Sequence, residues 1–85
     1  MKTALKKILS EQLKAFKLAN ENDVEMIIRR NMLMTLMDFI RDNFIFDDVP
    51  AIAMDVKQEL KSFTFSKKDA IEKLDELEGI INNIF

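Results

Sequence analysis

The residue types that carry out nucleophilic and acid–base catalysis are scarce in this 85-residue chain, which contains neither His nor Cys. The nearest approach to a nucleophile beside a base is Ser10 with Lys14, one helical turn later. A lysine serves as a base when it is buried away from water, whereas this pair falls on the expected exposed face of its helix. The sequence therefore predicts a protein that is not an enzyme.

Ligands for cofactors and metals are equally limited. Without His and Cys, transition metals lose their commonest protein ligands, and a chain with one Gly has no glycine-rich phosphate loop. The acidic residues of the C-terminal segment fall on one side of a helix and are interpreted as a solvated face. They are Asp69, Glu72, Asp75 and Glu76. We expect no cofactor and no metal site.

A lysine stripe is the first candidate binding surface. At about 100° per helical residue, four lysines of the N-terminal segment fall within one arc: Lys6, Lys7, Lys14 and Lys17. The stripe can be a solvated face, a contact for the phosphate backbone of RNA or DNA, or a complement to the acidic face of the last helix in a second subunit. Tyr and Trp are absent and the sequence pI is about 5.1, which does not favour nucleic acid.

Two arginines interrupt the most apolar segment, "VEMIIRRNMLMTLMDFI" (24–40). A helical wheel places Arg30 on the polar flank but Arg29 inside the apolar arc. Glu25, one turn before Arg29, can pair with it. Two interpretations stay open: a structural bridge with Glu25, or an arginine that anchors an interface with a partner.

Apolar side chains outside the expected core arcs suggest a docking face. Ile27, Met34 and Met54 lie off the main arcs, and five methionines occur between Met26 and Met54. Methionine fills cores but also suits adaptable binding surfaces. The partner-binding candidates are therefore Arg29, Ile27, Met34 and Met54.

Four helices must position these residues. Apolar residues recur at steps of three and four over about 4–19, 24–43, 49–62 and 67–84. Helix starts are indicated by Asn22 or Asp23, by Asp47 or Asp48 with Pro50 in the first turn, and by Ser66 with Asp69. The expected core rows are Leu5, Ile8, Leu9, Leu13, Phe16 and Ala19; Ile28, Met32, Leu33, Leu36, Met37, Phe39, Ile40 and Phe44; Val49, Ile52, Ala53, Val56, Leu60 and Phe63; and Ala70, Leu74, Leu77, Ile81 and Ile84.

These elements predict an all-α fold, a compact bundle of about four short helices forming one domain over residues 1–85. The apolar arc of the second helix, with Ile27 and Met34, exceeds what three short neighbours cover, so we expect a homodimer or larger oligomer. No apolar run reaches the length of a membrane span, and no signal peptide is recognised, so a cytoplasmic protein is expected. The abundance of Lys, Asn, Ile, Phe and Met over Arg, Gly, Pro and Ala suggests an AT-rich genome, as in many bacteria and phages. We therefore expect a bacterial or phage-type interaction protein that binds a larger macromolecule and regulates or inhibits it.

One segment shows a resemblance. Over "LSEQLKAFKLANENDVEMIIR" (9–29), through Leu9, Glu11, Leu13, Lys14 and Arg29, the chain resembles the helical opening of small tail-domain proteins related to the tRNA-dependent amidotransferase B subunit. The chain is much shorter than that two-part family, so no activity is carried over.

Overall fold

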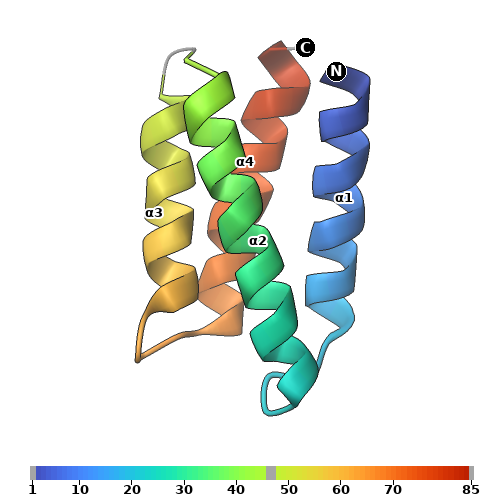
Figure 1. Ribbon diagram of the computed structural model, residues 1–85, viewed down its shortest axis with the longest axis vertical. Helices are drawn as coiled ribbons and strands as arrows, with labels where there is room; N and C mark the ends of the chain where they lie inside the picture. The colour runs from blue at the N-terminus through green and yellow to red at the C-terminus, as the bar shows by residue number, and fades with distance from the viewer. Residues whose placement is uncertain (1, 46–47, 85) are drawn as a thin grey trace.

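The computed structural model describes residues 2–45 and 48–84, apart from the Lys2 side chain, and this part of the chain forms four α-helices. They are α1 (Lys2–Leu18), α2 (Val24–Asn43), α3 (Val49–Lys61) and α4 (Lys67–Ile84). Consecutive helices run antiparallel, so α1 and α3 point one way and α2 and α4 the other (Figure 1). The predicted all-α bundle of about four helices is confirmed.

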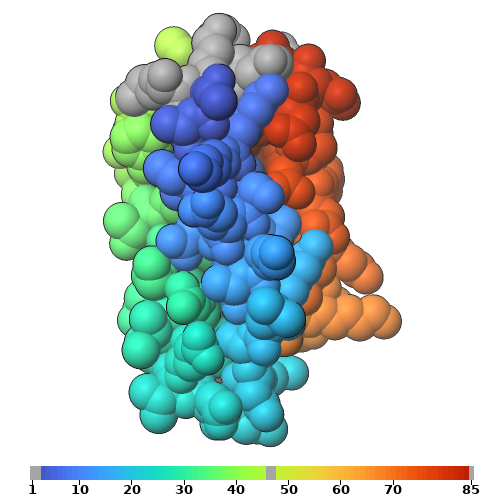
Figure 2. All heavy atoms as spheres, turned by 90° about the vertical axis from the view of Figure 1, so that its right-hand side faces the viewer, coloured from blue at the N-terminus to red at the C-terminus, as the bar shows by residue number. Residues whose placement is uncertain are grey.

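Each helix packs against two others, which closes the bundle. The closest packing is between α2 and α3, and α1 lies against α2 on one side and α4 on the other. Figure 2 views α1 from outside, with α2 along its left and α4 along its right. The bundle is 34 Å long, and α2, with 20 residues, spans most of that length.

The core is apolar throughout, because every buried side chain of the described residues is a hydrophobic one. Each helix contributes a row at steps of three and four, as a helix does when one face is buried. The complete set is Leu5, Leu9, Leu13, Phe16, Ala19, Met26, Leu33, Met37, Ile40, Phe44, Val49, Ala53, Val56, Leu60, Ala70, Leu74, Leu77 and Ile81. In the predicted rows of α3 and α4, Ile52 and Ile84 are only partly buried against the core, and the buried residues are Val49, Ala53, Val56, Leu60, Ala70, Leu74, Leu77 and Ile81.

The helix starts agree with the expected capping residues, although the side chains take part unevenly. Ser66 Oγ accepts the backbone N–H of Asp69 at 3.3 Å, as a capping residue should. Asp23 and Asp48 occupy the N-cap positions of α2 and α3 without making a side-chain cap bond, and Pro50 lies in the first turn of α3. The alternative cap Asp47 lies outside the described residues.

Several predicted core residues are in fact exposed. Ile8, Met32 and Phe39 are at least two-fifths exposed, because α1 and α2 diverge towards the end of the bundle that holds the N-terminus (Figure 1). Ile28, near the start of α2, is 51% exposed and lies outside this region. In their place, Met26 of α2 is buried. Phe63 is fully exposed, because α3 ends at Lys61 and the helical spacing that would have turned its ring inward is lost.

Candidate binding groove between α1 and α2

An apolar groove of about 590 Å³ lies between the N-terminal part of α1 and the C-terminal part of α2. It is lined by Ala4, Leu5, Ile8 and Gln12 of α1 and by Met32, Thr35, Leu36 and Phe39 of α2. Six of these eight residues are apolar, and Gln12 and Thr35 are the only polar ones. A concave, mostly apolar surface with few polar groups is typical of ligand and partner sites.

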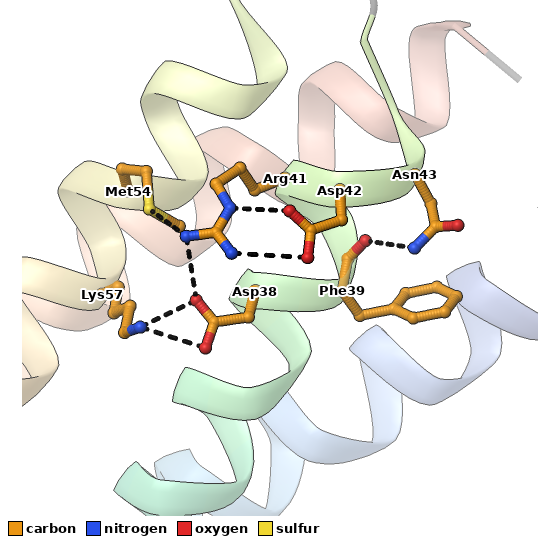
Figure 3. A network of polar contacts seen from close by, with 7 residues as sticks. All are labelled: Asp38, Phe39, Arg41, Asp42, Asn43, Met54 and Lys57. Atoms are coloured by element: carbon orange, nitrogen blue, oxygen red, sulfur yellow. Dashed lines mark hydrogen bonds and ion pairs between the residues drawn. The ribbon is translucent and has the colours of Figure 1, made fainter.

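The helical period builds both walls of the groove. Ala4, Ile8 and Gln12 recur every four residues on α1, and Met32, Leu36 and Phe39 recur at four and three on α2, so each row lies along one side of its helix. Figure 3 shows the Phe39 ring on the side of α2 away from Asp38, directed towards α1. The sequence placed most of these apolar residues in the core. The structure leaves Ile8 46% and Phe39 40% exposed.

Gln12 gives the groove an unsatisfied hydrogen-bond acceptor. Its Oε1 atom is buried and has no hydrogen-bond partner. A buried carbonyl oxygen that lacks a donor costs free energy, so this oxygen is suited to a donor from a bound molecule. The sequence signal for this site is that Gln12 is a polar residue within the apolar arc of α1.

The lysine stripe is divided by the fold. Lys17 Nζ lies 3.0 Å from Asp75 Oδ1 of α4, and the helical period puts Lys6 on this same side. Lys7 and Lys14 are exposed on the outer face of α1, one turn to either side of Glu11 at the edge of the groove. Basic α1 and acidic α4 thus meet within one chain at Lys17.

The four partner-binding candidates are not brought together. Arg29 Nη2 lies 3.4 Å from Glu25 Oε1, so the predicted bridge is present, and Arg29 Nε is buried without a hydrogen-bond partner. Ile27 is exposed, whereas Met34 and Met54 are half-buried and pack against the core. Their part in partner binding stays a prediction.

Arg30, rather than Arg29, joins two elements. Arg30 Nε donates to the carbonyl of Leu60 at 2.6 Å, and Nη2 donates to the carbonyl of Ser62 at 3.3 Å. Its guanidinium also stacks over the Phe65 ring, 4.1 Å from the centroid. These contacts place a cation on the last carbonyls of α3, which is the favourable end of the helix dipole. A helical wheel describes one helix at a time, so it places Arg30 on the polar flank of α2 and cannot show its contacts with α3.

A second polar cluster lies between α2 and α3, outside the groove (Figure 3). Lys57 Nζ donates to both carboxylate oxygens of Asp38, at 2.8 and 3.0 Å. Arg41 Nε donates to Asp42 Oδ1 at 2.9 Å, and Nη1 lies 3.4 Å from the Met54 sulfur. The hydrogen bond with Asp42, strengthened by the charge of that carboxylate, raises the pKa of Arg41. The same bond lowers the pKa of the Asp42 carboxyl. All of these side chains are paired within the chain, which is the behaviour of a structural network.

No group of three or more acidic residues within the described part of the chain is arranged to hold a metal ion. None of the helices in residues 2–45 and 48–84 is long and apolar enough to cross a membrane.

Comparison of the chain with family models, curated proteins and solved structures gives no match. The resemblance to the amidotransferase tail domain is therefore not supported by a family model.

Proposed function

We propose that this chain is a small, non-enzymatic interaction protein that binds a larger protein partner through the groove between α1 and α2, and thereby regulates or inhibits that partner. The observation that carries the proposal is the groove itself, because six of its eight lining residues are apolar and Ile8, Met32 and Phe39 remain well exposed. Exposed apolar surface that is gathered in one place commonly marks an interaction site. A regulator of bacterial or phage type fits its small size.

The proposal is tested by cross-linking from inside the groove. A photoreactive amino acid replaces Thr35, which lines the groove, and the irradiated protein is recovered from its native host with and without nuclease. We expect a covalent adduct with one protein, unaffected by nuclease and lost when Phe39→Gln is added. The absence of an adduct contradicts the proposal, and an adduct that nuclease removes supports the RNA- or DNA-associated alternative instead.

Self-association forms a second part of the proposal and uses a separate surface. Val24 and Ile27, at the start of α2, are 72% and 56% exposed and do not line the groove. Pairing of this surface between two copies would cover it. Sedimentation equilibrium at micromolar concentration should give about twice the chain mass of 9.9 kDa. A single species at the chain mass, independent of concentration, contradicts the dimer.

A further inference from the structure

We infer that the groove binds a short amphipathic α-helix of the protein partner, with an acidic edge on the side of α1 and a hydrogen-bond donor facing Gln12. This inference rests on the proposed function and names the class of partner segment. Three features of the groove carry it: its shape, its area and the charges along its edges.

The shape of the groove matches one helix. Its two walls are antiparallel helices, and the space between two such helices accepts a third by the packing of side-chain ridges into grooves. The row of α2 that lines the groove, from Met32 to Phe39, is eight residues long, which corresponds to roughly 11 Å, or about two helical turns. A partner helix of that length would place apolar side chains at steps of three and four against this row.

The area of the groove favours a single helix over a second folded copy. Of the residues that line the groove, Ile8, Met32 and Phe39 are 46, 40 and 40% exposed. Because a large apolar side chain carries about 200 Å² of surface, these three leave roughly 250 Å² available. A stable interface between two folded proteins buries about 800 Å² on each of them. A helix that fills the concave surface uses the smaller area fully, whereas a convex copy would meet the edges of the groove first.

The charges differ between the two edges. On α1, Lys7 and Lys14 flank Glu11, so this edge carries a net positive charge, and both lysines are exposed. On α2, the helical period places Asn31, Thr35 and Asp42 along the edge, and Asp42 is paired with Arg41. Acidic residues on the α1 side of the bound helix would complement the lysines. The buried Gln12 Oε1 would accept a hydrogen bond that the free protein does not supply.

The test uses a displayed library of helix-forming peptides, about four turns long, with randomised surface positions, selected for binding to the full chain. Enriched peptides are then measured by fluorescence anisotropy against Phe39→Gln and against the matched control Phe63→Gln, since Phe63 is exposed in the turn after α3. We expect apolar residues at helical spacing and acidic residues on one edge, with affinity about tenfold lower for Phe39→Gln and unchanged for Phe63→Gln. Circular dichroism checks that each variant folds, and Ile8→Gln replaces Phe39→Gln if that variant does not.

A charge exchange tests the orientation. Changing the acidic edge of an enriched peptide to Lys should weaken binding to the natural chain, and Lys7→Glu with Lys14→Glu should restore it. The inference is overturned if no peptide is enriched, or if the enriched peptides lack helical spacing. It is also overturned if these peptides bind Phe39→Gln as well as they bind the natural chain, or if the chain forms a dimer that Phe39→Gln dissociates. The proposed function fails separately, when no host protein is cross-linked from position 35.

Discussion

Gln12 illustrates how one side chain can lower stability while preparing a surface for binding. Its amide oxygen is buried at the groove without a hydrogen-bond partner. An acceptor left in this state costs about 1–3 kcal/mol, and an apolar replacement of similar shape is neutral or stabilising. We expect Gln12→Met to raise the free energy of unfolding by about 1 kcal/mol, measured by urea denaturation.

The same variant should bind partner peptides more weakly, since it has lost the acceptor. Gln12→Glu serves as the opposite control, because a buried carboxylate without a partner destabilises more than an amide. A Gln12→Met protein that is clearly less stable than the natural chain would show that the oxygen is satisfied in solution.

Asp42 gives a pH-dependent prediction at the surface. Its carboxyl pKa lies below the ordinary value because of the hydrogen bonds from Arg41. A folded-state pKa below the unfolded one means that this pair contributes its stability above the ordinary pKa of Asp, and that the contribution is lost as the pH falls through the folded-state pKa. In Arg41→Gln the Asp42 pKa should return towards its ordinary value, as measured by an NMR titration of the carboxyl carbon.

Lys57→Gln is the matched control for this titration. Lys57 acts on Asp42 only through its charge and is the weakest of the influences on that carboxyl, so the Asp42 pKa should change less than in Arg41→Gln. Equal changes in the two variants would contradict the assignment of the shift to the Arg41 hydrogen bonds.

Among the elements, α2 and α3 are linked by Arg30, in addition to their apolar packing and the Lys57–Asp38 ion pair. Its two hydrogen bonds to the last carbonyls of α3 and its stacking on Phe65 predict that Arg30→Met lowers the free energy of unfolding by about 2 kcal/mol. Thermal and urea denaturation measure this loss. The neighbouring Arg29→Met removes an ion pair within α2 and a contact with the Met32 sulfur, and it also removes the buried Nε that has no partner. It should therefore cost no more than about 0.5 kcal/mol. Similar losses from the two variants would show that Arg30 is not a link between the helices.

The elements also show how far the sequence leads. Local signals were sufficient for the four helices, because caps such as Ser66 and the steps of three and four in α4 are properties of one segment. The groove could not be predicted in this way, because Ile8 and Phe39 have the same spacing whether two helices touch or diverge. Arg30 was missed for a related reason, since its acceptors Leu60 and Ser62 lie 30 and 32 residues further along the chain.

At the scale of the whole molecule, the polar ties between α1 and the other helices gather at the C-terminal end of α1. Lys67 Nζ of α4 donates to the carbonyls of Lys17 and Ala19 at the end of α1, at 2.7 and 2.6 Å. The Phe16 and Phe65 rings meet edge to face, 6.1 Å apart, and Arg30 binds at the end of α3 nearby. In Figure 1 the turns that follow α1 and α3 both lie at the lower end.

This one-sided arrangement has a consequence for motion. Among the side chains described for residues 3–14 of α1, no hydrogen bond or ion pair reaches another helix, so this half is held by apolar packing alone. Opening of α1 should therefore begin at its N-terminal half and stop near Phe16, where the ties begin. Hydrogen exchange followed by mass spectrometry should find faster exchange of the amides from Lys6 to Ser10 than of those from Leu13 to Lys17. The groove would then widen by small rotations of one half-helix about a fixed base, and partners of different side-chain volume would be accommodated without unfolding the bundle.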